Sequence, residues 1–114
     1  MSHRVSSETL RILRNDLDMT YIIYALEIPW RFDDMKLRFI CPQCRGLDTS
    51  VHPKVNLGRC FGCNRNFNTI DLVMACKNYP FRKALDWLMT LRKVLDTEDG
   101  ELLLSRQARR NRLS

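Results

Sequence analysis

The sequence contains no long hydrophobic run. Its longest apolar stretch covers residues 21–26 and ends at Glu27, whereas a membrane-spanning helix needs about 20 apolar residues. No apolar segment of signal-peptide length follows the first residues, and no internal repeat is present. We therefore expect an intracellular, cytoplasmic protein that has no membrane partner.

An acidic cluster arranged for two-metal phosphoryl transfer is also missing, because Asp33-Asp34 and Glu98-Asp99 are typical of a turn and of a break after a helix. The 114 residues, 45% hydrophobic and 28% charged, fit one ordinary globular domain. The chain has no room for a doubly wound catalytic domain beside a second module. We expect a protein that is not an enzyme and has no small-molecule substrate.

Acidic residues are outnumbered by basic ones, 13 against 19, which gives a formal net charge of +6 and favours a polyanionic partner. Residues 31–70 carry seven cations and three anions, and residues 101–114 carry four and one. A break after Asp96 separates a domain, residues 1–96, from a basic tail, residues 97–114, which we expect to be flexible. The tail is interpreted either as a nucleic-acid-binding extension or as a solvated end.

Helical spacing of apolar residues marks both ends of the chain, and short alternating runs mark its middle. The runs at 36–40, 49–52 and 56–59 are separated by Pro and Gly and predict short antiparallel strands. The fold class is therefore α+β, a small antiparallel sheet flanked by N-terminal and C-terminal helices. The residues predicted to begin the four helices are Ser6 or Ser7, Asp18, Thr69 and Pro80.

The chain has five cysteines, an odd number, so a disulfide scaffold would leave one of them unpaired. Four of them form two Cys-x-x-Cys pairs, Cys41 with Cys44 and Cys60 with Cys63, separated by fifteen residues. Two such pairs supply the four thiolates of a tetrahedral zinc site with no open position. The spacing predicts one structural Zn²⁺ ion that completes a zinc ribbon, with iron or redox-active cysteines as alternatives.

Four residues near these pairs carry further expectations. Gly46 and Gly62 are expected to give the two cysteine turns their backbone freedom. His52 lies between the pairs, but a Val-His-Pro turn favours an exposed strand-edge residue over a ligand. Cys76 falls on an apolar helix and is expected to be a small buried side chain.

The run Arg59-Cys60-Phe61-Gly62-Cys63, followed by two apolar helical segments, resembles the zinc-binding domain of bacterial DnaG-type primases. The resemblance extends over about Ser7 to Val94. It includes Cys41-Pro42-x-Cys44, Ser50-Val51-His52-Pro53, Ile70–Met74 and Phe81-x-x-Ala84-Leu85-x-x-Leu88. The chain departs from the family pattern at Cys44, which replaces a histidine ligand, at Asn64 and Asn66, which replace glycines, and at Thr49, which replaces an aromatic residue.

This resemblance implies a zinc ribbon that binds single-stranded template DNA and helps to set where a primer starts. Because the polymerase domain of a full primase is absent, we expect a non-catalytic, stand-alone accessory protein. It would act in trans with a primase, polymerase or helicase in DNA replication, for example on a phage, plasmid or other mobile element.

Basic residues interleaved with aromatic ones surround the cysteine pairs, and such residues bind phosphates and stack on bases. The alternative for the cations is a solvated sheet, and Phe61, inside the second turn, is expected in the core. The predicted DNA-binding residues are Lys36, Arg38, Phe39, Arg45, Lys54, Arg59 and Arg65.

Two other functions fit the same residues. The first is a regulatory zinc ribbon that docks on a replication or transcription enzyme, with Tyr21, Trp30 and Trp87 as anchors. The second is a redox enzyme that uses Cys-x-x-Cys, which requires an exposed thiol of low pKa.

Overall fold

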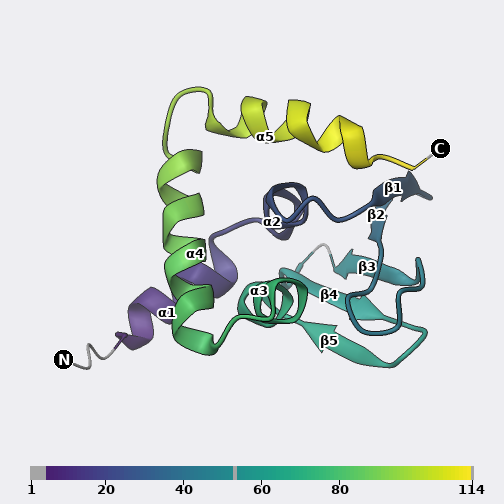
Figure 1. Ribbon diagram of the computed structural model, residues 1–114, viewed down its shortest axis with the longest axis horizontal. Coiled ribbons are helices and arrows are strands. Elements are labelled where there is room, and N and C mark those ends of the chain that lie inside the picture. Colours follow the sequence, from purple (N-terminus) through teal and green to yellow (C-terminus); the bar gives the residue numbers. More distant parts are fainter. Residues whose placement is uncertain (1–4, 53, 114) are drawn as a thin grey trace.

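The chain forms helices packed on one antiparallel sheet, as a computed structural model shows for residues 5–52 and 54–113 (Figure 1). The predicted α+β class is confirmed. No helix among these residues is long and apolar enough to cross a membrane. The helices are α1 (Ser7–Asn15), α2 (Met19–Ala25), α3 (Thr69–Lys77), α4 (Phe81–Leu95), α5 (Gly100–Ala108) and the short 3-10 helix η1 (Arg109–Asn111). The strands are β1 (Trp30–Asp33), β2 (Lys36–Phe39), β3 (Thr49–His52), β4 (Leu57–Cys60) and β5 (Arg65–Phe67).

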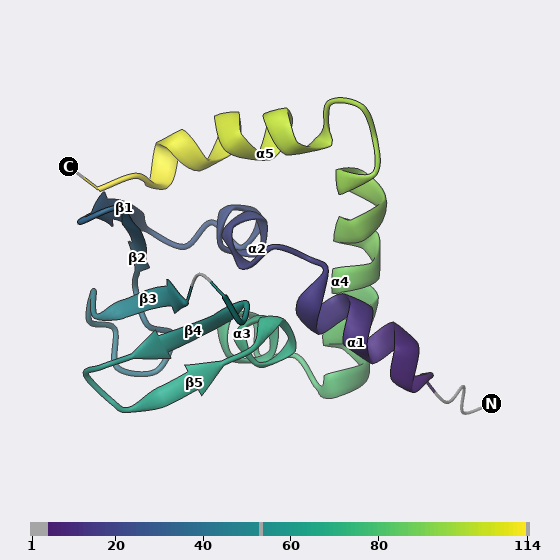
Figure 2. The same cartoon turned by 180° about the vertical axis from the view of Figure 1, so that it is seen from behind.

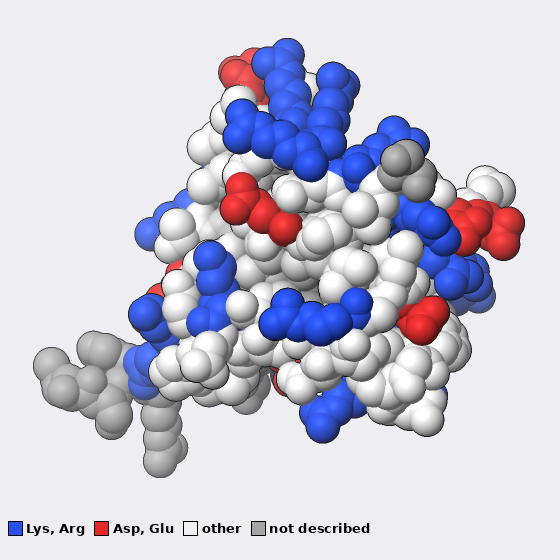
Figure 3. All heavy atoms as spheres, turned by 45° about the vertical axis from the view of Figure 1, so that its right-hand side comes forward, with Lys and Arg blue, Asp and Glu red and all other residues white. Residues whose placement is uncertain are grey.

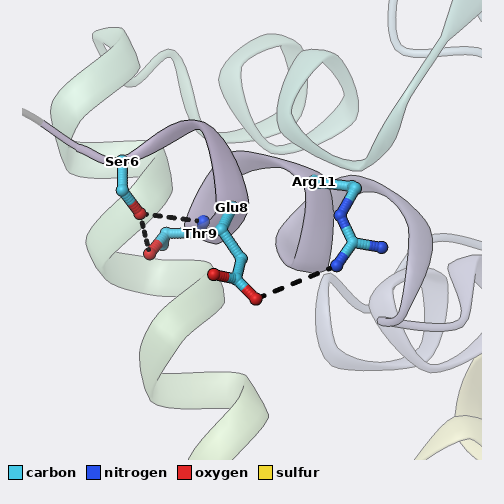
Figure 4. A network of polar contacts seen from close by, with 4 residues as sticks. All are labelled: Ser6, Glu8, Thr9 and Arg11. Carbon is cyan, nitrogen blue, oxygen red and sulfur yellow. Dashed lines mark hydrogen bonds and ion pairs between the residues drawn. The ribbon is translucent and has the colours of Figure 1, made fainter.

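Polar side chains cap the first two helices, as the sequence predicts. The Ser6 hydroxyl oxygen accepts a hydrogen bond from the Thr9 amide at 3.1 Å, and an ion pair between Glu8 and Arg11 follows in the first turns (Figure 4). Asp18 caps α2 by accepting a hydrogen bond from the amide two residues on. These caps satisfy amides that the helix itself leaves unpaired.

The cap of α3 is Asn68, one residue before the predicted Thr69. Asn68 and Asp71 exchange side-chain-to-backbone hydrogen bonds and form a capping box. Thr69 is buried instead, and its hydroxyl donates to the carbonyl oxygen of Leu13 at 2.7 Å. The residue predicted as a cap therefore joins α3 to α1.

The five strands form a meander in chain order, with every neighbouring pair antiparallel. The three predicted strands are present as β2, β3 and β4, whereas β1 and β5 are additional. β5 has only three residues, too few to show alternation. The turn between β1 and β2 uses Asp34 and Met35 at φ 50° and 64°, a left-handed conformation that Asn-Gly or Asp-Gly usually signals.

One face of the sheet packs against the helices and forms the core. Its largest fully buried side chain, Phe39, lies with Leu37 and Phe67 in one core cluster with apolar residues of α2 and α3. Both ribbon views place α2 and α3 between the sheet and α4, with α5 across the end of the molecule (Figures 1 and 2). The sheet thus has one apolar face and one polar face.

The segment beyond residue 96 differs from the expected tail. Residues 96–99 separate α4 from α5, as the predicted break requires, but α5 then packs against α2 and buries Leu104 and Ala108. The indole Nε1 of Trp30 donates to the carbonyl oxygen of Ala108 at 3.0 Å. These contacts make the segment part of the fold.

Gly58 provides a test of the core packing. A Cβ at this position would lie 2.9 Å from Cζ of the buried Phe39 ring, whereas a Cβ at Gly46 would meet nothing closer than 3.5 Å. We predict that Gly58→Ala lowers the free energy of unfolding by about 1–3 kcal/mol because the ring must move. Chemical denaturation checks this, and Gly46→Ala is the control. Equal stability of the two variants would contradict this packing.

Candidate metal centre and the polar face of the sheet

Four cysteine sulfurs meet where β2 and β4 end. Cys41 lies two residues after β2 and Cys60 is the last residue of β4, while their partners Cys44 and Cys63 follow in the turns. All four Sγ atoms lie within 4.8 Å of one another. The Cys41–Cys63 and Cys44–Cys60 sulfur distances are 3.7 and 3.5 Å. Tetrahedral ligation at about 2.3 Å per bond places sulfurs about 3.8 Å apart, so the four thiols can hold a metal ion.

The two cysteine turns share one backbone feature, a left-handed residue directly after the second cysteine. Arg45 has φ 66° and Asn64 has φ 58°, while no described glycine has a positive φ. The expectation that Gly46 and Gly62 supply this backbone freedom is therefore wrong. Gly62 supplies space, because a Cβ there would lie 3.2 Å from Oδ2 of Asp48.

Hydrogen-bond donors lie near two of the four sulfurs, where they can stabilise thiolates. The amides of Gln43 and Cys44 point to Sγ of Cys41 at 3.4 and 3.5 Å. Thr49 lies opposite Cys60 in the β3–β4 register, and its buried hydroxyl has no hydrogen-bond partner among the described residues. A thiolate at Cys60 is the acceptor that this hydroxyl lacks. These donors fit metal-bound thiolates at Cys41 and Cys60.

The pKa values of the cluster thiols are shifted in opposite directions. Burial raises the pKa of Cys60, but the backbone amide of Cys63 and the neighbouring Cys44 and Cys63 thiols lower it to about 6. Cys60 is nevertheless buried. At the exposed Cys44, the Gly46 backbone lowers the pKa, yet the Cys60 thiol and burial outweigh this effect and raise it. A redox nucleophile is an exposed thiol of low pKa, whereas here the thiol of lowered pKa, Cys60, is buried and the exposed Cys44 has a raised pKa.

The other two candidate ligands lie outside the cluster. His52 is exposed, as predicted, and its Nδ1 accepts a hydrogen bond from the Lys54 amide at 3.1 Å. Cys76 is exposed, so the prediction of a buried side chain is wrong. It borders a hollow beside Cys41 and Pro42. Among the described residues, no second group of three or more potential metal ligands comes together.

The polar face of the sheet carries a row of side chains that crosses all five strands. The strand register aligns them, because residues directly opposite each other point to the same face. Arg31 and Arg38 are 41% and 33% exposed. We call Arg31, Arg38 and Arg59 the arginine row. The full row is Arg31, Arg38, Ser50, Arg59 and Asn66.

Two aromatic predictions on this sheet are wrong. Phe39 is fully buried and cannot stack on a base, because its strand alternation turns it toward the helices. Phe61 is 64% exposed rather than part of the core, because the cysteine turn projects beyond the sheet. The guanidinium carbon of Arg59 lies 5.6 Å from the centre of the Phe61 ring, which places this aromatic side chain next to the arginine row.

The remaining predicted DNA-binding residues are scattered. Lys36 is exposed at the start of β2, opposite Asp33. Lys54 borders a hollow with acidic residues of the α1–α2 connection, while Arg65 lies near α3 and Arg45 near Cys76. Sequence reasoning missed Arg31, whose place in the row depends on the hairpin that joins β1 to β2. Alternation of Arg31 with Trp30 and Phe32 is the only sequence signal that points to it.

The expected protein-docking anchors are unequal. Trp30 is buried and cannot anchor a partner, while Tyr21 and Trp87 are half-buried.

No protein-family model matches the chain, and no curated protein matches it significantly. A function for this chain is therefore inferred chiefly from the geometry of the four cysteines and of the sheet.

We predict one metal ion per chain, lost when a cluster thiol is removed. Cys60→Ser should remove the ion and lower the melting temperature, because structural sites contribute on the order of 10 kcal/mol to folding. Cys76→Ser is the matched control and should keep the full metal content. Elemental analysis of the purified proteins measures this. A metal-free wild-type protein, or equal loss in both variants, would show that the cluster holds no metal.

Proposed function

We propose that this protein is a zinc-dependent, non-catalytic accessory of DNA replication that binds single-stranded DNA. The observation that carries the proposal is the arginine row on the strands that also lead to the four-cysteine cluster. The similarity of the cysteine turns to those of primase zinc domains supports the same role. Each part of the proposal rests on a separate feature.

Zinc is the metal that four cysteine thiolates in tetrahedral geometry favour. Cys41, Cys44, Cys60 and Cys63 would hold it, with the amides around Cys41 and the Thr49 hydroxyl donating to the sulfurs. The ion supplies a fixed, fully coordinated cross-link, and it leaves no position for a water molecule. Its role is then to hold β2, β4 and their turns in register.

The arginine row is suited to a chain of phosphates. Arg31 and Arg38 lie directly opposite each other on neighbouring strands, whose backbones are about 5 Å apart. Like charges in such a cross-strand pair repel each other. Asp33 contacts both, at 3.7 Å in each case, but one carboxylate balances only one of the two charges. A bound phosphate relieves the remaining repulsion.

Single-stranded DNA fits this surface better than duplex DNA does. The exposed ring of Phe61 beside Arg59 can stack on an unpaired base, and such stacking contributes about 1–3 kcal/mol per base. Bases in a duplex already stack on each other and leave only their edges in the grooves. The combination of an aromatic face with a row of cations is typical of single-strand binding.

A primase, polymerase or helicase is the partner that the resemblance suggests, with the protein acting in trans. The alternative is a regulatory module that binds such an enzyme and no DNA. Loss of Trp30 as an anchor weakens that alternative. Removal of the arginine row distinguishes the two functions, because it should weaken DNA binding but not binding to a partner enzyme.

We predict salt-dependent binding of single-stranded oligonucleotides that requires the arginine row. Arg38→Gln with Arg59→Gln should weaken binding at least tenfold, and the slope of log affinity against log salt should flatten by about 1.4, or about 0.7 per lost phosphate contact. Lys54→Gln with Arg65→Gln removes the same charge away from the row and serves as the control. Fluorescence anisotropy measures both.

The proposal is wrong if wild-type protein shows no binding at low salt, or if binding does not depend on salt. Equal weakening of the two double variants would mean that net charge, and not the row, determines affinity. If the double variant Arg38→Gln with Arg59→Gln still bound its partner enzyme, and the function of the protein did not depend on DNA binding, the regulatory alternative would be favoured.

A further inference from the structure

We infer that the arginine row continues into a second phosphate-binding site, a basic groove between β1 and the C-terminal segment. This inference rests on the proposed function and extends the DNA path on the same surface. The groove is lined by Arg31, Phe32, Asp33, Arg109, Arg112 and Leu113. We call these residues the β1 groove.

The C-terminal segment forms one wall of the β1 groove because it pairs with the free edge of the sheet. Arg112 forms a parallel bridge with Trp30, and the Leu113 amide donates to the Trp30 carbonyl oxygen at 2.6 Å. The Arg112 guanidinium carbon lies 5.6 Å from the centre of the Trp30 ring. Trp30 also holds the end of α5 through its indole hydrogen bond to Ala108. One buried tryptophan therefore fixes the basic end of the chain beside β1.

The charges of the groove are unbalanced. Three arginines line it, and Asp33, its one acidic residue, is shared with Arg38 of the row. Within the described residues, the Arg109 side chain makes no hydrogen bond or ion pair, and Nε of Arg31 is buried without an acceptor. An anion is therefore the ligand that this groove lacks. Figure 3 shows basic side chains gathered at the top of that view, where α5 lies.

Arg31 belongs to both the arginine row and the β1 groove. A single DNA strand bound to Arg59 on β4 and Arg38 on β2 would meet Arg31 next. It would enter the β1 groove at that residue. Phe32, which is 55% exposed at the groove, offers a second aromatic face for a base. Arginines on β4, β2, β1 and the C-terminal segment, with Phe61 beside Arg59 and Phe32 at the groove, match a polynucleotide better than an acidic peptide.

The decisive experiment compares oligothymidylates of about 4 and about 16 nucleotides, which span the range of site sizes of small single-strand binding domains. Arg109→Gln with Arg112→Gln should weaken binding of the long strand about tenfold and flatten its salt slope by about 1.4. Binding of the short strand, which the arginine row holds, should change less than twofold. Arg106→Gln with Arg110→Gln is the matched control, since both residues are exposed on the same segment but do not line the groove.

Arg112 contacts Trp30, so the single variant Arg109→Gln is measured as well, and melting temperatures show whether each variant folds. Arg109→Gln should alone weaken long-strand binding about threefold without a change in melting temperature. Equal affinity of the groove variant and the control for the long strand would overturn the inference. So would an oligoglutamate peptide that binds through the groove while long and short strands bind equally.

The outcomes separate this inference from the proposed function. If wild-type protein binds neither strand, the proposed function fails and the groove with it. If substitution of Arg38 and Arg59 abolishes binding while the groove variant behaves as the control, the arginine row stands and only the groove is rejected.

Discussion

The convergence of four cysteine sulfurs is the constraint on which the geometry of the sheet depends. The four sulfurs lie within 4.8 Å of one another, so the turns after β2 and β4 meet at this point, with β3 between the two strands. Four thiolates this close together repel one another, so all four thiols lose their protons only when a bound cation compensates the negative charge. A sheet with strands of three or four residues has little stability of its own, so a metal cross-link at this point would have a large effect. The core packed by α2 and α3 then covers the face to which Cys60 belongs.

The same constraint determines where the cations lie. Side chains alternate along a strand, so Cys60 on the core face places Arg59 on the polar face. Antiparallel register transmits that orientation through Ser50 to Arg38 and then to Arg31. A one-residue slip would bury the arginines and expose the core. The four-cysteine cluster and the arginine row are therefore two consequences of one register. The β1 groove extends this surface at the edge where the C-terminal segment pairs.

The parts of the fold that local chemistry encodes could be predicted from the sequence. Helix caps at Ser6 and Asp18, the three central strands and the four clustered cysteines depend on spacing and residue type within a few positions. The β1–β2 hairpin could not be predicted, because Asp34 and Met35 adopt left-handed conformations without a glycine. The environments of Phe39 and Phe61 are the reverse of those predicted, because exposure depends on which face the helices cover. The packing of α5 depends on Trp30, a residue far away in the sequence.

X-ray absorption spectroscopy of the purified protein at the zinc edge measures the ligands of the metal centre itself. We expect zinc with four sulfur neighbours at about 2.3 Å and no nitrogen or oxygen ligand. Fewer than four sulfurs, a nitrogen or oxygen atom bound to the metal, or cysteines joined in disulfides without a metal would contradict a four-thiolate zinc centre.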